Sequence, residues 1–491
     1  MAPASDPPGV HVEEVPSGRP PLQRAPTAVT AFVGPARRGP LDSPVEVRSL
    51  AEFTRRFGRR WRRSELAYAV EAFFDGGGAR AVIVRVASAD ASTASLDVDG
   101  LRLAASSAGR WGNRITATVT HDAAGSEAAF ILELKQGSQT ETFTDLAVDD
   151  PRRFERALDA SDLVRLDGAL PTVRPAAGTY AVARADRGSH GAALVADDYI
   201  GTAPGAAPRG LHALDAAEDV DLICLPPPQR GGELPASVWP AAAAYARARG
   251  AMLLLDPPAD VDAEDVAPWV AGVGVAADDA SHVAAYFPRL RWPRGSRRDL
   301  LLAPSGAVAG VYARTDLESG VWKAPAGADA TLACAVGLEH DLSEPDIALL
   351  SEAGINALRA DAAFPLVWGA RTLAGAQGHP ASEWKYVPVR RLALHVERSL
   401  VRGLAWAVFE PNDEPLWAEV RAVVGQFLLE LYRDGALLGS RPRDAWFVRC
   451  GRDTMTQADL DRGVLRVQVG LAATRPAEFA IVAIELAMSQ A

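Results

Sequence analysis

The sequence predicts an α/β protein of several domains, and three observations support that prediction. Strand patterns alternate with helix patterns in two separate stretches, which is typical of an α/β layer architecture. The stretch between them shows strand-like alternation of apolar and polar residues and few helix signals. The chain has 491 residues, more than one hydrophobic core usually supports, so roughly two to four domains are expected.

The domain boundaries are expected where these patterns change. We expect an N-terminal arm at 1-26, an α/β core at 27-87 and 181-365, an inserted β-rich domain at 88-180, a C-terminal α+β domain at 366-475 and a C-terminal arm strand at 476-491.

The first part of the core begins with two predicted strands, TAVTAFVG and PVEVRS. Ser49 and Glu52 then form a capping box that opens a helix, and Gly58 closes it. A second helix starts near Ser64 and stops at DGGG, before the strand AVIVRVA. A phosphate loop needs a strand before its glycines and a helix after them, so this glycine run is predicted to be a helix C-cap.

The inserted domain is predicted from the alternating segments RITATVTH and AAFILELKQG, with one short helix at PRRFERALDA. The α/β rhythm then resumes with the strand VDLICLP, a helix at 237-249, the strand AMLLLD and the helix AEDVAPWVAG. The proline- and glycine-rich segments LLAPSGAVAG and WKAPAGA are predicted to be surface loops and short helices.

The last quarter has its strongest helix pattern after Asp413, an N-cap followed by Pro415 in the first turn. One apolar stripe of this helix comprises Leu416, Val420, Val423, Val424, Phe427, Leu428 and Leu431. Gly435 ends the helix. The strand AWFVRC, a short helix capped by Thr456 and the alternating segment VLRVQVG follow.

Each end of the chain carries a short strand pattern that has no partner nearby in the sequence. These are PGVHVEEV, behind a proline-rich leader, and EFAIVAIELAM, behind the break TRP. Unpaired N–H and C=O groups make any exposed sheet edge a template for an added strand, and that edge can belong to another copy. The two segments therefore predict a polymer.

Composition narrows the classes of function. The net charge of −11 argues against a nucleic-acid binder, which needs a basic face. No run of 18 or more apolar residues is present, so no membrane span is expected. The N-terminus lacks a secretory signal pattern, and the three cysteines lie far apart, which favours reduced thiols and a cytoplasmic location.

Two residues are candidates for catalysis. Asp256 ends the AMLLLD strand, where α/β proteins commonly place ligand-binding groups, but a turn before Pro257 and Pro258 is favoured. Ser305 lacks the GxSxG arrangement and is better interpreted as a helix N-cap. The histidines and cysteines show no zinc-site spacing. A hydrolase that uses Asp256 or Ser305, and a monomeric binding module, remain the alternative functions.

Several long segments of the chain stand out together, and they include PGVHVEEVPSGRPP, AVTAFVGPARRGPLDSPVEVRSLAEFTRRFG, LAYAVEAFFDGGGARAVIVRV, PSGAVAGVYARTDLESGVWKAPAG and EWKYVPVRRLALHVERSLVRGLAWAVFEPNDEPLWAEVR. These segments resemble the tail sheath protein family of contractile phage tails and related contractile injection systems. The similarity covers nearly the whole chain, and none of the segments is a catalytic motif. It implies that the α/β core is subtilisin-like in topology, without protease activity.

The resemblance also implies a helical homo-polymer around an inner tube protein, with baseplate and tail-terminator or cap proteins at its ends. It implies no cofactor, catalytic residue or metal, and neither nucleic-acid binding nor direct membrane insertion. The subunits would assemble in the cytoplasm as part of a phage tail or a phage-tail-like particle.

In the family, terminal arms interlace with neighbouring subunits. Carried onto this chain, the donated strand residues are Val10, Val12, Val15, Phe479, Ile481, Val482 and Ile484. The family's C-terminal domain faces the tube, so the expected tube-facing residues are Arg421, Glu430, Arg449, Arg452 and Asp459.

Overall fold

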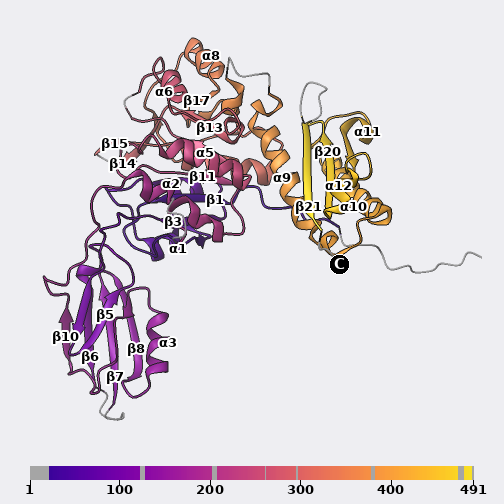
Figure 1. Ribbon diagram of the computed structural model, residues 1–491. Coiled ribbons are helices and arrows are strands. Elements are labelled where there is room, and N and C mark those ends of the chain that lie inside the picture. Colours follow the sequence, from indigo (N-terminus) through magenta and orange to yellow (C-terminus); the bar gives the residue numbers. More distant parts are fainter. Residues whose placement is uncertain are drawn as a thin grey trace, which may run out of the picture. The chain divides into compact units, whose positions relative to one another are not determined.

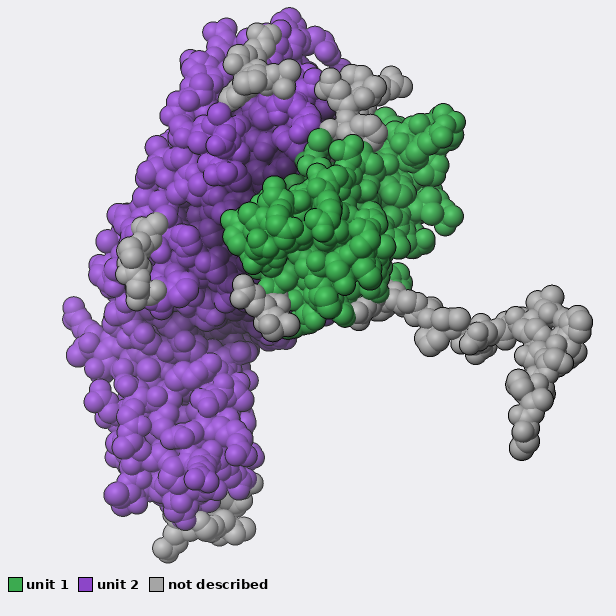
Figure 2. All heavy atoms as spheres, turned by 45° about the vertical axis from the view of Figure 1, so that its right-hand side comes forward, with its two compact units in different colours: residues 1–25, 395–491 green, residues 26–394 purple. Residues whose placement is uncertain are grey.

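The structure, a computed structural model, describes residues 21-121, 128-201, 207-259, 261-294, 297-376, 382-473 and 480-488. The chain forms two compact units, coloured separately in Figure 2. The smaller unit comprises Met1–Ala25 and His395–Ala491, and the larger unit comprises Pro26–Leu394. The division falls inside helix α9 (Val387–Gly403). The finer domain boundaries expected from the sequence remain predictions.

An eight-stranded sheet forms the centre of the larger unit, in the order β18-β17-β13-β12-β11-β1-β3-β2 (Figure 1). The strands are β1 (Thr30–Gly34), β2 (Val45–Val47), β3 (Ala81–Arg85), β11 (Leu222–Cys224), β12 (Met252–Leu255), β13 (Val283–Phe287), β17 (Ile355–Arg359) and β18 (Leu366–Val367). The strands from β17 to β3 are parallel, and the edge strands β2 and β18 are antiparallel to their neighbours.

Both faces of this sheet are covered by helices, because successive side chains of each strand point to opposite faces. Phe32 and Ile83 belong to the apolar cluster on one face, whereas Ala31 and Val33 belong to the cluster on the other. The first face carries α1 (Leu50–Phe57), α2 (Leu66–Asp75) and α7 (Ser305–Ser319). The second carries α4 (Ala196–Ile200), α5 (Val238–Arg249), α6 (Val266–Gly272) and α8 (Glu344–Glu352). The core is therefore a three-layer α/β sandwich.

Helix α7 overturns the prediction that the LLAPSGAVAG segment forms surface loops and short helices. It is a helix of 15 residues whose first nine are buried, and it packs against α2. A Cβ atom at Gly306 would lie 2.4 Å from the Ala69 carbonyl oxygen, and one at Gly310 would lie 2.7 Å from that of Phe73. The glycines allow the two helix backbones to approach closely, so they serve tertiary packing here and not a turn.

The β-rich insertion lies within the larger unit and contains two antiparallel sheets. One has the order β10-β6-β7-β8 and the other β4-β5-β9. Their bounds are β4 (Ser95–Val98), β5 (Leu101–Ala105), β6 (Thr116–Thr120), β7 (Ala129–Gln136), β8 (Gln139–Ala147), β9 (Val164–Leu166) and β10 (Gly178–Ala181). Helix α3 (Pro151–Asp159) lies beside β8 (Figure 1) and buries Phe154 and Leu158. A separate apolar cluster thus supports the insertion.

The remaining elements of the larger unit are short. A three-stranded sheet of order β15-β14-β16 consists of β14 (Leu290–Arg294), β15 (Arg297–Leu302) and β16 (Gly337–Leu338). The 3₁₀ helices of the chain are η1 (Gly112–Arg114), η2 (Gly210–Ala216), η3 (Ala280–His282), η4 (Leu373–Gly375), η5 (Glu383–Lys385) and, in the smaller unit, η6 (Ala405–Phe409).

The smaller unit packs helices against a three-stranded sheet of order β19-β20-β21. Its elements are α10 (Glu414–Arg433), α11 (Pro442–Ala445), β19 (Trp446–Arg449), α12 (Gln457–Asp461), β20 (Val464–Leu471) and β21 (Ala480–Ala487). Asp413 caps α10 as predicted, with its side chain accepting a hydrogen bond from the Leu416 backbone N–H. Of the predicted apolar stripe, Val423 is half-buried and the other members are buried.

The local helix signals in the sequence are confirmed with one exception. Ser49 and Thr456 cap α1 and α12, Gly58 closes α1, and the glycine run after Asp75 terminates α2. The prediction that Ser305 is a helix N-cap is wrong by one position, because Pro304 is the N-cap and Ser305 is the first residue of α7. Within the described part of the chain, no helix has the length and apolar character needed to cross a membrane.

Candidate functional site

The C-terminal strand β21 lies against β20 of its own chain. The two strands pair antiparallel over their whole lengths, from Val464 opposite Ala487 to Leu471 opposite Ala480. The segment predicted to be donated to a neighbouring subunit therefore has a complementary strand in the same chain. Within one chain, the edge of β20 is the position that β21 occupies, and donation to a neighbouring subunit stays a prediction.

The two faces of β21 differ in burial. Val482 and Ile484 point inward with Val467 and Val469 of β20 and are buried. Ile481 lies on the outer face, where 51% of its surface is exposed. Phe479 and the N-terminal strand residues Val10, Val12 and Val15 lie outside the described residues. The inner side chains fix the register, because a shift by one residue would place them in solvent.

The outer face of this sheet carries charged and polar side chains beside Ile481, together with one aromatic contact. Gly470 of β20 lies beneath the ring of Phe447, and a Cβ atom there would be 2.0 Å from the ring. The Arg449 guanidinium lies over the same ring, at 4.9 Å from its centroid. Arg466 and Glu485 form an ion pair between β20 and β21. These contacts hold the face together while leaving Arg449 exposed.

Strand β21 is the last strand of its sheet among the described residues. Its outer edge pairs with no other described strand, so its backbone groups on that side can accept a further strand. The smaller unit thus contains a strand, β21, that pairs with the edge of β20. The outer edge of β21 can in turn pair with a further strand.

The five predicted tube-facing residues lie in different environments. Arg452 is exposed, as is Arg449, and Glu430 accepts a hydrogen bond from Gln426 Nε2 at 3.0 Å. Arg421 donates to the Cys450 carbonyl oxygen and to Glu414 Oε1. Arg449 and Arg452 have the most accessible charges of the set.

Asp459 is almost fully enclosed by hydrogen bonds in the cap of α12. Its carboxylate accepts from the Thr456 backbone N–H and hydroxyl and from Arg462 and Arg466. The hydrogen bonds from Thr456, followed by that from Arg462, hold the pKa of Asp459 well below its ordinary value. Asp459 therefore has a local structural role, because its hydrogen bonds join α12 to β20.

Asp256 and Ser305, the two candidates for catalysis, lie together in the larger unit although they are 49 positions apart in the sequence. Asp256 ends β12 as predicted, and its Oδ1 accepts a hydrogen bond of 2.9 Å from the Ser305 backbone N–H. Its Oδ2 and the Ser305 Oγ are buried and have no hydrogen-bond partner among the described residues. No described histidine forms a hydrogen bond with either side chain, so the pair lacks the base that would activate a serine.

Two further buried charges accompany this pair, and sequence reasoning missed both. Arg289 Nη1 lies 3.6 Å from Glu65 Oε1, and both side chains are 2% exposed. Glu65 accepts hydrogen bonds from the backbone N–H groups of Gly231 and Ala303, which joins three loops at the carboxyl edge of the sheet. Burial raises the pKa of Glu65 to about 7 and that of Asp256 to about 6. Their position in the sequence could have indicated this cluster, because ligand-binding groups often follow strand ends. Asp256 follows the predicted strand β12, and Arg289 follows β13.

Comparison of the sequence with protein-family models and with curated proteins gives no match. Solved structures do match. The sheath tail protein of Listeria innocua superposes with a TM-score of 0.68 at 13% identity, covering 94% of this chain and 96% of that one. The corresponding protein of Desulfitobacterium hafniense gives 0.63 at 14% identity, over 98% and 100% of the two chains. The PVC sheath of an extracellular contractile injection system, in its contracted state, gives 0.58 at 23% identity, over 98% of each chain.

The chain has the sheath fold. The fold that the sequence resemblance implied is thereby confirmed at the level of a mixed α/β protein matched over nearly its whole length. Within the sheath fold, the polar cluster around Asp256 belongs to the central sheet of the larger unit, and β21 belongs to the smaller one. The two sets of candidate residues, catalytic and assembling, are therefore carried by different units.

Proposed function

We propose that this chain is a structural subunit of a contractile sheath, which polymerises helically around an inner tube and contracts to drive the tube through a target envelope. The observation that carries the proposal is the match over 98% of the chain to a sheath complex in the contracted state. Such a match over both units favours a subunit of the same kind of polymer. In this proposal the larger unit has the subtilisin-like topology that the resemblance implies, without proteolysis.

The arms would link the subunits. A neighbouring copy's β21 would take the place that β21 occupies here on β20, and the N-terminal strand at 10-15 would add to a remaining edge. Val482 and Ile484 supply the buried face for this exchange, because the pocket that receives them on β20 is the same in every copy. Exchange of an identical element between copies costs little free energy, and a heterologous contact that does not close gives a helical filament.

Contraction would repack rigid subunits into a shorter and wider helix. Packed interfaces are bistable and do not deform continuously, so a trigger at the baseplate can pass from ring to ring. The exposed charges of Arg449 and Arg452 are the best candidates for contact with the inner tube protein, and baseplate and cap proteins would bind the sheath ends. Assembly in the cytoplasm, as part of a phage tail or an injection device, completes the proposal.

Electron microscopy of the purified full-length chain tests this function. We expect tubes or rings from the full-length chain, and their loss when residues 1-20 are deleted. Residues 1-20 precede every described helix and strand, so we expect the shortened chain to keep its circular dichroism spectrum and its unfolding transition.

Two outcomes would contradict the proposal. A full-length chain that stays monomeric at high concentration would favour a monomeric binding module. Tubes of normal length from the shortened chain would show that the N-terminal strand does not link the subunits.

A further inference from the structure

A pocket of 570 Å³ lies at the carboxyl ends of three neighbouring strands of the central sheet. Pro35 and Ala36 follow β1 directly, Val86 follows β3, and Pro228 belongs to the loop after β11. Residues from the loop at 190-194 close another side. All of the residues that line the pocket belong to the larger unit.

The pocket lies where the winding of the sheet changes direction. β1 is flanked by β3 on one side and β11 on the other. The connection from β1 to β3 runs through α2 on one face, whereas the connection from β11 to β12 runs through α5 on the other face. In open parallel sheets this reversal leaves a crevice outside the carboxyl ends of the strands, and ligands bind there.

The charge around this crevice is opposite to that of the whole chain. Arg63 and Arg85 line the pocket, and Arg37 and Arg110 are close enough to act on the same histidine, His190. None of these four arginines forms an ion pair with a carboxylate among the described residues, although the chain has a net charge of −11. Unpaired arginines gathered at one site are the usual means of binding an oxyanion.

Arg85 is the buried member of this group. It is 2% exposed, and its guanidinium donates to the carbonyl oxygens of Ala36, Gly39 and Ala108 at 3.1, 2.6 and 2.6 Å. These three acceptors are neutral carbonyl groups, so they do not compensate the positive charge of Arg85, and Asp42 does so only in part. Burial lowers the pKa of Arg85 to about 10, and Asp42, whose charge opposes this, pairs with Arg209 instead, at 3.4 Å. An anion in the pocket would offset this cost.

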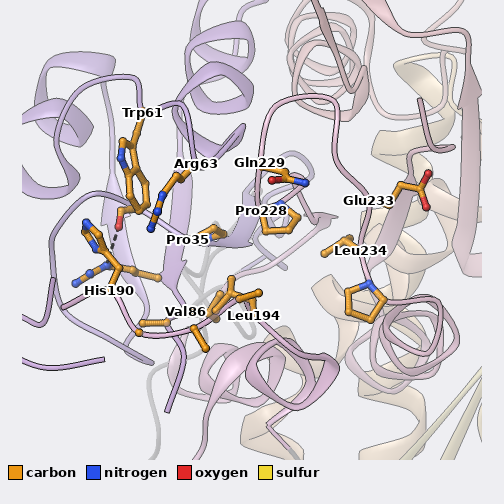
Figure 3. Close-up of a pocket in the computed structure, with 17 residues that line it drawn as sticks. Pro35, Trp61, Arg63, Val86, His190, Leu194, Pro228, Gln229, Glu233 and Leu234 are labelled. Carbon is orange, nitrogen blue, oxygen red and sulfur yellow. Dashed lines mark hydrogen bonds between the residues drawn. The ribbon is translucent and has the colours of Figure 1, made fainter. Parts of the chain in front are cut away.

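Two aromatic rings, tilted against each other by 46°, lie next to the arginines. The rings of Trp61 and His190 are 4.6 Å apart, and Figure 3 shows both beside Arg63 at one side of the pocket. Burial, followed by the charges of Arg85 and Arg63, lowers the pKa of His190 to about 4. The imidazole is therefore neutral at neutral pH and offers a stacking face. Gln229 and Glu233 lie across the pocket, away from Trp61 (Figure 3).

We propose that this pocket binds a small organic anion in which a phosphate or carboxylate is carried on a planar ring. The oxyanion would lie against Arg63 and in the field of Arg85, while the ring stacks on Trp61 with His190 at its edge. A hydroxyl or amino group at the far end of the ligand would donate to Glu233. The site is independent of the assembly surfaces described above, because no strand of the smaller unit lines it.

Isothermal titration of the full-length chain with three simple probes tests the two halves of this recognition. Phenyl phosphate carries both the ring and the oxyanion, inorganic phosphate carries the oxyanion alone, and phenol carries the ring alone. We expect phenyl phosphate to bind about tenfold more tightly than either of the other two, because charge and stacking act together. Equal affinity for phenyl phosphate and inorganic phosphate, or no binding of phenyl phosphate, would overturn the proposal.

Substitutions then locate the binding site. Arg63→Glu and Trp61→Ala should each weaken phenyl phosphate binding by about tenfold or more, since each removes one half of the recognition. Arg62→Glu is the matched control, because Arg62 is exposed, adjacent in sequence and absent from the pocket lining. Unchanged binding in the Arg63→Glu variant, or an equal loss in the Arg62→Glu variant, would refute the assignment to this pocket.

Discussion

At the scale of single residues, Asp256 carries a prediction about pH. Its carboxyl has an ordinary pKa of 3.8, and burial raises this to about 6 in the folded chain. Between these values the folded state binds more protons than the unfolded state, so stability from this group is present at low pH and is lost as pH rises through 6. An asparagine cannot ionise, and it keeps the acceptor for the Ser305 N–H.

The Asp256→Asn variant should therefore gain stability relative to the natural chain as pH rises. The free energy of unfolding of the variant minus that of the natural chain should increase by about 2 kcal/mol between about pH 4 and about pH 7.5. Urea denaturation at the two pH values measures this difference. Glu65, whose pKa is raised to about 7, contributes in the same direction to both chains and largely cancels. A difference that stays constant with pH would show that Asp256 ionises normally in the fold.

The same residue shows what a sequence can and cannot predict about a site. The position of Asp256 at the end of β12 follows from a run of apolar residues that ends in an acid. Its contact with Ser305 does not follow from the sequence, because the contact depends on where the start of α7 lies against the sheet. The sequence pattern of this segment predicted surface loops and short helices instead of α7. The pocket that Arg63 and Arg85 line is assembled from five separate segments of the chain, so no single sequence motif predicted it.

At the scale of elements, β21 allows a direct test of strand exchange. Gln468 and Ala483 lie opposite each other on the outer face of β20 and β21. Cysteines at directly opposed positions of antiparallel strands are close enough to form a disulfide. Oxidation of a Gln468→Cys, Ala483→Cys double variant should cross-link assembled tubes into chains of subunits, seen as a ladder on a denaturing gel.

The unassembled form of the same variant is the internal control. There β21 pairs within its own chain, so oxidation should give a cross-linked monomer of unchanged mass. Gln468→Cys alone should give neither product. Tubes that dissociate into cross-linked monomers would mean that β21 remains on its own β20 after assembly, and strand exchange at the C-terminus would be excluded.

Local chemistry made most elements predictable. Ser49, Asp413 and Thr456 satisfy backbone N–H groups at helix starts, a requirement that holds whatever the tertiary structure. Helix α7 was not predictable in this way, because Gly306 and Gly310 are unfavourable within an isolated helix and are explained only by the contact with α2. The terminal strand was correctly recognised as a strand, but its partner could not be chosen from sequence.

At the scale of the whole molecule, the α/β layers follow from alternating patterns, whereas the sheet order does not. The strand order β12-β11-β1-β3 places the second part of the core beside the first. The β-rich insertion lies within the single connection from β3 to β11. The resemblance to the tail sheath family implied a subtilisin-like topology but did not specify this strand order. The crevice at the reversal of winding is a consequence of this order, so it emerges only with the structure.

The net charge of the whole chain also determines how assembly should respond to salt. Identical copies that each carry a charge of −11 repel one another, and this repulsion acts over about 30 Å at 0.01 M salt but only about 8 Å at 0.15 M. Backbone pairing and apolar contacts between arms and sheets are much less affected by screening. We therefore expect the lowest protein concentration that gives tubes to fall as sodium chloride rises between these values, as measured by sedimentation. A threshold that instead rises with salt would mean that complementary charged contacts, and not strand pairing, dominate the polymer.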